Sequence, residues 1–241
     1  MIDVHCLWIG GPLSAMERLA LTSHVRMGHT CRLWTYEPPD NAPQGVVPED
    51  AGQILPRDRV FTYQHGPGRG SVAAFANLFR YTLLCERGGW WADTDVVCLR
   101  PFDFPAEYVF ASEQTPRCRQ VANAVIKAPA GSPVMEYCRR SAQQRDPATL
   151  NWGDTGPTLV GEAVRRFRLD AYVVPPETFC PVPFFDVAAV RSRPIDLRSA
   201  HAVHLWNEMW RRHGWDKNAA CPEGCLFETL KRRFLGESVA R

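Results

Sequence analysis

The chain has 241 residues, of which 45% are hydrophobic and 22% are charged, which is ordinary for a soluble globular protein. The formal net charge of +2 is too small to indicate a protein that binds nucleic acid or acidic lipid. No window approaches ~20 uninterrupted apolar residues, so no membrane span is expected. The N-terminal sequence MIDVHCLWIGG has neither a basic nor a long apolar region and does not predict a signal peptide.

The cysteines give an indication of the compartment. There are nine, an odd and scattered number, and several lie in apolar runs. This pattern favours reduced, buried thiols in a cytoplasmic protein over a disulfide framework. Cys221 and Cys225 have no second cysteine or histidine pair to complete a zinc site, so we interpret them as structural thiols rather than metal ligands.

The N-terminal region predicts a strand, a helix and a second strand. Residues 3–9 form an apolar run that ends in a glycine pair and a proline, as a buried strand followed by a turn does. Ser14 and Glu17 match a capping box, and the helix they begin should continue to about Met27. Residues 31–36 are expected to form the next strand. This β-α-β order predicts a sheet with parallel strands.

The middle of the chain predicts a buried helix and two strands. Residues 40–58 are rich in Pro, Gly and Asp and are expected to form a loop. Ser71 can cap a helix at 72–86 that is apolar nearly all round, so this helix should be buried. Gly88 and Gly89 should end it. Short strands are then expected at 90–92 and 96–99.

The C-terminal region should complete one α/β domain. Its predicted elements are strands at 108–111, 124–127 and 202–206, helices from Ser132 to about Arg145, after Pro157 and at 226–235, and a proline-broken extended segment at 171–185. We therefore expect residues 1–241 to form a single domain.

Two carboxylates, Asp93 and Asp95, follow an apolar strand and a glycine pair. Alternate residues of a strand face one side, so the two carboxylates can converge on one point. They repel each other there, and a divalent cation that bridges the protein to a diphosphate would relieve the repulsion. The alternative is a pair of turn carboxylates that cap backbone N–H groups. The position at the edge of a buried sheet, where ligands of open α/β sheets bind, favours the cation site.

Three further side chains have two interpretations each. Arg80 lies on an apolar helix and needs an anion, which could be Asp93, Asp95 or a ligand, so a purely structural ion pair is the alternative. Trp8 could stack on a nucleobase or belong to the core. His204 could ligate a metal, although a histidine on a strand is more often a satisfied core residue.

Together these features resemble the DxD sugar-transferase family of GT-A fold. This family contains the yeast initiating α-1,6-mannosyltransferase, the α-1,4-galactosyltransferases and bacterial capsule enzymes, and the glucosyltransferase domains of clostridial toxins are distant relatives. The resembling segments are Arg80-Tyr81-Thr82-Leu83-Leu84, Gly88-Gly89, Trp91, Asp93-Thr94-Asp95, Trp8-Ile9-Gly10-Gly11, Asn123, Thr155-Gly156-Pro157 and His204-Leu205-Trp206. The chain departs from the family where Asn77 replaces the usual Asp, Trp91 replaces Tyr, and Met209 precedes Trp210.

The resemblance implies a GT-A-like (Rossmann-like) α/β domain with a mixed, mostly parallel central sheet flanked by helices. Residues 1–100 would form a nucleotide-binding half and residues 101–241 an acceptor-side half with a closing segment. The implied activity is a metal-dependent, retaining transfer of a hexose from a nucleotide sugar, expected to be a UDP-hexose, with Mn²⁺ or Mg²⁺. The acceptor remains open between a glycan, a lipid-linked intermediate and a protein. We expect a cytoplasmic enzyme of polysaccharide biosynthesis, with no nucleic-acid partner and with peripheral contact at the inner face of the membrane if the acceptor is lipid-linked.

The resemblance also assigns expected roles to individual residues. Asp93, Asp95 and Arg80 are the expected catalytic residues, and Asp95, Asp93 and His204 the expected metal ligands. The expected donor-binding residues are Trp8, Ile9, Gly10, Asn77, Arg80, Trp91, Asp93, Thr94, Asn123, His204, Trp206, Asn207 and Trp210. On the acceptor side, the candidates are Glu113, Asp154, Thr155 and Gly156.

Two other functions are compatible with the sequence. The segment Asp93-Thr94-Asp95-Val96 also imitates the DxDx[TV] nucleophile motif of phosphatases of the haloacid-dehalogenase type. That motif usually ends the first strand near the N-terminus, whereas here it lies in the middle of the chain. The second alternative is a non-catalytic nucleotide-sugar-binding protein, which the changes at Asn77 and Trp91 allow.

Overall fold

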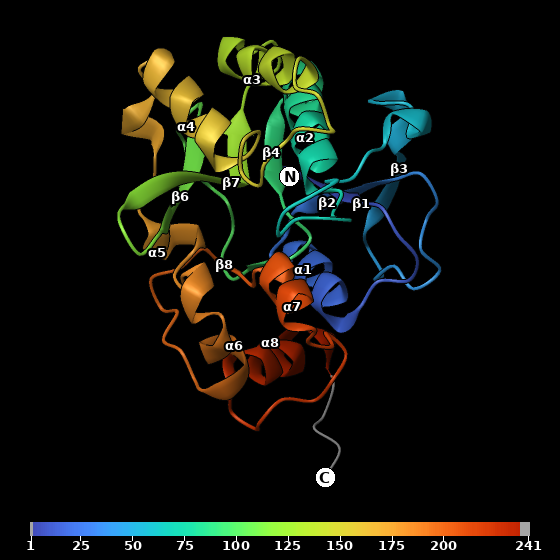
Figure 1. The fold of residues 1–241 in the computed structure, drawn as a ribbon. Coiled ribbons are helices and arrows are strands. Elements are labelled where there is room, and N and C mark those ends of the chain that lie inside the picture. The colour runs from blue at the N-terminus through green and yellow to red at the C-terminus, as the bar shows by residue number, and fades with distance from the viewer. Residues whose placement is uncertain (1, 237–241) are drawn as a thin grey trace.

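A six-stranded sheet forms the centre of the computed structural model, which describes residues 2–236 (Figure 1). Its strands are β1 (Asp3–Trp8), β2 (Thr30–Thr35), β3 (Val47–Asp50), β4 (Gly89–Ala92), β6 (Val109–Gln114) and β7 (Arg119–Ala128). The strand order is β3-β2-β1-β4-β7-β6. β1 pairs in parallel with β2 and β4, and β2 in parallel with β3, whereas β7 is antiparallel to both β4 and β6. The predicted mixed, mostly parallel sheet is therefore confirmed.

The first helix, α1 (Ala15–Arg26), connects β1 to β2 and begins with the predicted capping box. The Ser14 hydroxyl accepts from the Met16 N–H at 3.2 Å, and the Glu17 carboxylate accepts from the Ser14 N–H at 2.8 Å. Two N–H groups of the first turn thus have partners. Glu17 is buried and also pairs with Lys217, which ties α1 to the C-terminal region.

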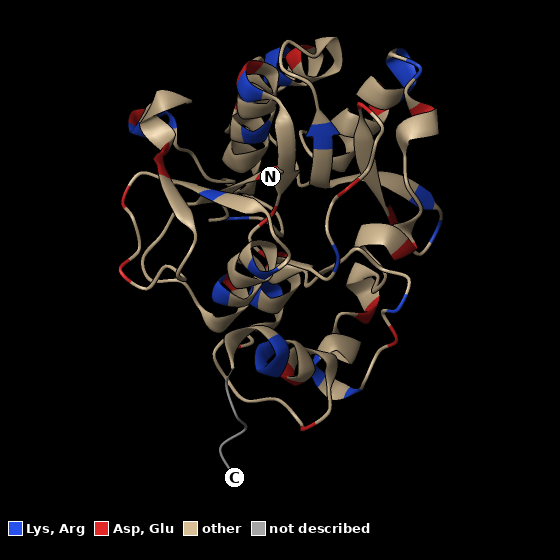
Figure 2. Ribbon diagram, turned by 180° about the vertical axis from the view of Figure 1, so that it is seen from behind, with Lys and Arg blue, Asp and Glu red and all other residues tan. Residues whose placement is uncertain are grey.

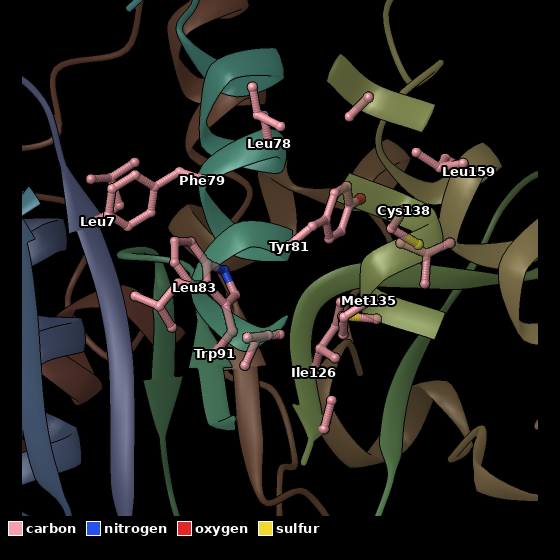
Figure 3. Packing of buried hydrophobic residues seen from close by; sticks show 14 of the residues in the cluster. Leu7, Leu78, Phe79, Tyr81, Leu83, Trp91, Ile126, Met135, Cys138 and Leu159 are labelled. Atoms are coloured by element: carbon pink, nitrogen blue, oxygen red, sulfur yellow. The ribbon is translucent and has the colours of Figure 1, made fainter. Parts of the chain in front are cut away.

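One face of the sheet is covered by α2 (Ala73–Arg87), α3 (Pro133–Gln143) and α4 (Pro157–Arg166) (Figure 1). Figure 3 shows Phe79 extending from α2 toward Leu7 of β1, and Tyr81 directed toward α3. The rings of Phe79 and Trp91 have centroids 6.3 Å apart. This packing fixes α2 directly behind the end of β4, which is where the candidate site begins.

A glycine is required where α2 turns into β4. Gly88 has a φ of 65°, and a Cβ there would lie 2.4 Å from the backbone nitrogen of Ala130. A larger residue would meet backbone as well as adopt a disfavoured conformation. At the other end of α2, the Ser71 hydroxyl accepts from the Ala73 N–H at 3.2 Å, although Val72 occupies the N-cap position.

The C-terminal region packs against α1 on the other face of the sheet. It contains α6 (Ala188–Ser192), α7 (Asn207–His213) and α8 (Leu226–Leu235), drawn in orange to red in Figure 1. A small second sheet joins this region to the middle of the chain, since β5 (Val96–Cys98) pairs antiparallel with β8 (Ala202–His204). Val96 and His204 are partners in this register. The strand that follows the Asp-Thr-Asp segment is therefore bound to the segment that contains His204.

Several sequence predictions of secondary structure were wrong. The expected loop at 40–58 contains the edge strand β3, which pairs only with β2 and whose sequence VPED does not alternate. The expected extended segment at 171–185 contains the short helix α5 (Pro176–Phe179), because a proline at the first helical position is tolerated. The short helices α6 and α7 were not predicted.

The nine cysteines are all free, as expected. Cys221 and Cys225 belong to no potential metal-binding group among the described residues. No helix in residues 2–236 combines the length and the apolar character needed to cross a membrane.

Candidate active site

A cavity of about 500 Å³ opens where β1 and β4 end. These two strands are adjacent and parallel, and β1 lies between β2 and β4. Ligands of open α/β sheets bind at the carboxyl ends of strands at such a point of the sheet. Trp8 closes β1, Asp93 directly follows β4, and both line the cavity.

Arg80 and Asp93 form a buried ion pair at the wall of this cavity. Arg80 Nη2 donates to Asp93 Oδ1 at 2.5 Å, and the side chains of Arg80 and Asp93 are 3% and 28% exposed. Trp91 Nε1 donates to the same oxygen at 2.7 Å, and the Arg80 guanidinium lies 4.8 Å from the centroid of the Trp91 ring. The indole N–H of Trp91 thus supplies a hydrogen bond to the aspartate, although the family's usual Tyr hydroxyl is missing.

Two asparagines extend this network along the cavity wall. Asn77 Oδ1 accepts from Arg80 Nη1 and from Asn123 Nδ2, each at 2.7 Å. Asn77 Nδ2 donates to Thr155 Oγ1 at 3.3 Å. The Asn77 amide therefore uses its oxygen twice and its nitrogen at least once, and it holds α2, β7 and the segment before α4 together.

Asp95 is held by the C-terminal region. His204 Nε2 lies 3.2 Å from Asp95 Oδ2, and the Asn207 backbone N–H donates to the same oxygen at 2.7 Å. The Leu205 N–H donates to the Asp95 carbonyl at 2.9 Å. Asp95 and His204 are both buried. A segment more than 100 residues downstream in the sequence thus fixes the second aspartate.

The ionisation of this cluster follows from burial and charge. Burial raises the pKa of Asp93, although the Arg80 guanidinium opposes this effect. Burial alone would also raise the pKa of Asp95, but the charge and hydrogen bond of His204 hold it below its ordinary value. Desolvation disfavours the charged form of His204, but the Asp95 carboxylate outweighs it and raises the His204 pKa well above its ordinary value.

The side chains of Asp93, Asp95 and His204 are suitable ligands for a divalent cation. Asp93, Asp95 and His204 each offer one ligand atom, and these atoms all lie within 4.8 Å of one another. One oxygen of each aspartate, Oδ2 of Asp93 and Oδ1 of Asp95, makes no hydrogen bond within residues 2–236. The His204 nitrogen closest to Asp95 is Nε2, which lies 3.2 Å from Asp95 Oδ2. Two hard oxygens and an imidazole beside them are a chemically reasonable set of ligands for Mn²⁺.

Two tryptophans, Trp8 and Trp206, border the cavity. Trp8 lines it from the end of β1, and its Nε1 donates to the Gly11 carbonyl at 2.8 Å. Trp206 lines it from the segment after β8, with its ring centroid 3.9 Å from that of His204. Trp206 has a φ of 60° and a ψ of 53°, a left-handed conformation that is uncommon for a non-glycine residue. Strained backbone of this kind often occurs at functional sites.

Two of the four candidate acceptor-side residues, Glu113 and Gly156, line the cavity, and Asp154 and Thr155 do not. Glu113 lines the cavity, is buried, and accepts from Gln120 Nε2 at 2.5 Å. Burial raises the pKa of Glu113. Gly156 also lines the cavity, whereas the buried Thr155 contacts Asn77 behind it.

Some predicted donor-side or acceptor-side residues lie elsewhere. Trp210 is fully buried in the core around α8, where its Nε1 donates to the Leu205 carbonyl at 2.9 Å, and it does not line the cavity. Asp154 accepts from the Asn151 N–H at 3.0 Å and is also outside the cavity lining. Ile9 and Thr94 line the cavity, but Gly10 beside them does not. Trp210 therefore supports the segment that contains Leu205 rather than contacting a donor.

Sequence reasoning missed several residues that line the cavity. They are Tyr63, Gln120, Trp152, Phe184, Glu208, Met209 and Arg212. Glu208 and Arg212 form an i,i+4 ion pair of 2.8 Å on α7. Their spacing could have indicated a helix after Trp206, but nothing in the sequence places that helix at the cavity.

A second group of potential ligands, His24, His29 and Cys98, lies in the core. His29 Nε2 accepts from the Phe102 N–H at 3.2 Å, which places the proton of a neutral ring on Nδ1. The Cys98 thiol faces the Arg100 carbonyl at 3.0 Å. Two of the three groups are thus already engaged, and we interpret the cluster as packing.

A comparison of the sequence with known families finds a match to one segment of the chain. Residues 58–115 match the model of the family described as a glycosyltransferase sugar-binding region containing a DXD motif. This segment includes Asn77, Arg80, Asp93, Asp95 and Glu113, all of which line the cavity. The match confirms the predicted resemblance to the DxD sugar-transferase family, and with it the prediction of a glycosyltransferase.

Comparison with solved structures agrees on the fold. The PaToxG glycosyltransferase matches with a TM-score of 0.50 and 15% identity over 70% of this chain and 71% of that chain. The apo form of the glycosyltransferase GlyE from Streptococcus pneumoniae TIGR4 matches with a TM-score of 0.50 and 11% identity over 98% of this chain and 63% of that chain. At this low identity the likeness concerns the fold alone, and it confirms the predicted GT-A-like α/β architecture.

Proposed function

We propose that the protein is a metal-dependent, retaining glycosyltransferase that takes a hexose from a nucleotide sugar. The observation that carries the proposal is the convergence of Asp93, Asp95 and His204, from separate parts of the chain, at the wall of a cavity of about 500 Å³. A cavity of this size is in the range of small-molecule sites. The choice of a UDP-hexose rests on the family resemblance.

The metal would be held by Asp95 and His204, with Asp93 as a third ligand. The imidazole in this set favours Mn²⁺ over Mg²⁺, because Mg²⁺ prefers sites made of oxygen alone. When bound, the cation would neutralise the charge that develops on the leaving diphosphate. The Asn207 N–H keeps the Asp95 carboxylate in one orientation, so the site is preorganised.

The donor would lie along the wall formed by α2 and β7. Trp8 at the end of β1 offers an aromatic face to the base. Arg80, Asn77 and Asn123 form a connected set of hydrogen-bonding groups that would orient the sugar. Because Arg80 is already fixed by Asp93 and Asn77, it would present its guanidinium with little loss of side-chain entropy.

The acceptor hydroxyl would approach from the side of Glu113 and Gly156. In a front-face mechanism, which retains the anomeric configuration, the acceptor attacks from the side on which the diphosphate leaves, and the departing phosphate oxygen can take the acceptor's proton. No protein nucleophile is needed in this mechanism. The residues of the chain would position donor and acceptor and exclude water.

The position of the motif does not favour an aspartyl-phosphate mechanism. The DxDx[TV] motif of such phosphatases usually ends the first strand, whereas Asp93 directly follows β4. The family match of residues 58–115 is to glycosyltransferases as well.

The free state of the nine cysteines supports a cytoplasmic location, and a role in polysaccharide biosynthesis follows from the resemblance.

The decisive experiment is a panel of nucleotide sugars, incubated with the protein in Mn²⁺ and scored for release of the nucleoside diphosphate. We expect one UDP-hexose to be hydrolysed or transferred, and EDTA to abolish the reaction. Binding of UDP without turnover of any donor would favour a non-catalytic nucleotide-sugar-binding protein. Turnover that survives chelation of the metal would contradict the proposal.

A further inference from the structure

A second concave surface, which we call the arginine groove, adjoins the cavity of the candidate active site, which would hold the donor and is called the donor cavity below. It encloses about 470 Å³ between the start of β7 and helix α4. Gln120, Pro157 and Thr158 line both the groove and the cavity, so the two spaces are contiguous. Asp93, Asp95 and His204 do not line the groove, which therefore offers room for a second ligand beside the donor.

Two cationic side chains line the arginine groove. Arg119 comes from β7 and Arg165 from α4, and both are exposed. Neither side chain makes an ion pair or a hydrogen bond with any residue in the range 2–236. Figure 2 shows basic segments at the end of α4 and around the β6–β7 hairpin on one side of the molecule. One acidic residue, Asp170, lies in the same lining.

The Arg165 guanidinium lies close to Gly161 of the groove lining. Its Nη1 is 3.5 Å from the position that a Cβ at Gly161 would occupy, and Gly161 is part of the lining. The missing side chain at Gly161 leaves space beside this guanidinium. Two arginines on one concave surface that have no partner among residues 2–236 are suited to an anion, because each guanidinium can bind a phosphate or carboxylate through two parallel N–H bonds.

A hydrogen bond connects the groove to the candidate acceptor-side carboxylate. Gln120 borders both spaces, and its Nε2 donates to Glu113, which lines the donor cavity. A molecule in the arginine groove would therefore extend past Gln120 toward Glu113. The proposed function assigns the acceptor hydroxyl to the same side of the cavity.

We propose that the arginine groove binds the acceptor and that the acceptor carries an anionic group, a phosphate or a carboxylate, held by Arg119 and Arg165. The inference rests on the proposed glycosyltransferase function, since it assigns the second substrate of that reaction. A phosphorylated sugar or lipid phosphate and an acidic sugar share this chemistry. Neutral glycans lack it.

The test is a calorimetric titration of the whole protein with its donor cavity filled by UDP and Mn²⁺. The probes are glucose 6-phosphate, glucuronate and glucose. We expect both anionic sugars, or one of them, to bind at least about tenfold more tightly than glucose, because only an anionic group can form charge-assisted hydrogen bonds with the two guanidinium groups. A preference for glucose 6-phosphate would indicate a phosphorylated acceptor, and a preference for glucuronate an acidic sugar.

Matched variants locate the binding. Arg119→Gln and Arg165→Gln should each weaken the anionic probe about tenfold while leaving UDP affinity unchanged. Arg165→Lys should restore part of the loss, since it keeps the charge without the bidentate geometry. Arg145→Gln, at an exposed position outside both linings, is the control and should bind like the wild type.

The outcomes separate this inference from the proposed function. If UDP binds in Mn²⁺ but the anionic sugars bind no more tightly than glucose, the assignment of the groove is wrong and the proposed function stands. The same conclusion follows if Arg119→Gln and Arg165→Gln bind the anionic probe like the wild type. If the wild type does not bind UDP, both proposals are overturned.

Discussion

Arg80 and Asp93 form an ion pair of 2.5 Å in which the arginine is almost completely buried and the aspartate borders the donor cavity. Removal of one partner leaves the other charge without compensation in a largely buried position. We therefore expect Arg80→Gln to lower the free energy of unfolding by about 3 kcal/mol. Urea denaturation followed by circular dichroism measures this change.

An exposed ion pair provides the comparison for Arg80. Arg140 donates to Glu136 at 2.5 Å on the surface of α3, and its side chain is 71% exposed. Because solvent screens such pairs, Arg140→Gln should cost less than about 1 kcal/mol. Equal effects of the two substitutions would show that burial of the Arg80–Asp93 pair does not determine its contribution.

Asp95 should be essential for activity. Asp95→Asn removes one negative charge from the candidate metal site while keeping the shape of the side chain. We expect turnover to fall by about a thousandfold, which corresponds to about 4 kcal/mol in the activation free energy. The measurement is steady-state release of UDP in Mn²⁺, with Mn²⁺ affinity determined separately by electron paramagnetic resonance.

The control for Asp95 is an aspartate far from the cavity. Asp40 is exposed in the loop that precedes β3 and makes no side-chain contact with the cavity. Asp40→Asn should leave turnover and Mn²⁺ affinity unchanged. Wild-type Mn²⁺ affinity in Asp95→Asn would exclude this carboxylate as a ligand.

Asn77 should influence the choice of donor sugar more than stability. Asp at this position could still accept from Arg80 and Asn123, and the Thr155 hydroxyl could rotate to donate to it. Its added charge would be partly compensated by Arg80. We expect Asn77→Asp to change the free energy of unfolding by less than about 1 kcal/mol.

The panel of nucleotide sugars tests whether Asn77 influences the choice of donor sugar. Asn77→Asp should shift the ratio of activities between UDP-hexoses, because the group that would face the sugar changes from an amide to a carboxylate. An unchanged ratio, together with normal folding, would show that Asn77 does not contact the sugar.

The predictions that succeeded came from local patterns with a direct physical cause. The capping box at Ser14 and Glu17 formed as predicted, and Gly88 ends α2 where its positive φ is required. The edge strand β3 could not be recognised, because its four residues are stabilised by pairing with β2 and not by an apolar pattern. The helix α7 was missed for a similar reason, since it follows the left-handed residue Trp206, whose conformation depends on the surrounding packing.

In the candidate site, too, the features with a local sequence pattern could be predicted, and those that depend on the tertiary structure could not. The Asp-Thr-Asp segment was identifiable as a pair of converging carboxylates, and the resemblance supplied His204. The sequence could not show that Gln120 connects two concave surfaces, because β7 brings it there only after the antiparallel pairing with β6 has formed. Trp210 was expected to bind the donor but does not line the cavity. A single sequence does not distinguish a tryptophan that lines a cavity from one that is buried behind the lining residues.

A pH dependence of stability is expected from His5. Trp34 Nε1 donates to His5 Nδ1 at 3.1 Å, so this nitrogen carries no proton in the folded protein. Burial lowers the pKa of His5 to about 4, whereas an unfolded histidine titrates near about 6.5. Between these values the unfolded chain binds a proton that the folded chain does not, so stability falls as the pH decreases from about 6.5.

The expected size of this effect is about 2 kcal/mol at pH 5 relative to pH 7.5. His5→Gln lacks the titrating group and should lose correspondingly less stability on acidification. Urea unfolding of both proteins at the two pH values measures the difference. An identical loss in wild type and variant would show that His5 is not responsible.

Because β5 pairs with β8, the candidate site can form only after the chain has been synthesised through β8. Everything from Trp8 to Asp95 can be present while the polypeptide is still being synthesised, but His204 and the Asn207 N–H are added only about a hundred residues later. A chain cut short before β8 would hold two neighbouring carboxylates without the histidine that stands beside Asp95 in the folded protein. Under the proposed function, metal affinity would therefore be acquired late, and an unfinished chain would not consume donor sugar.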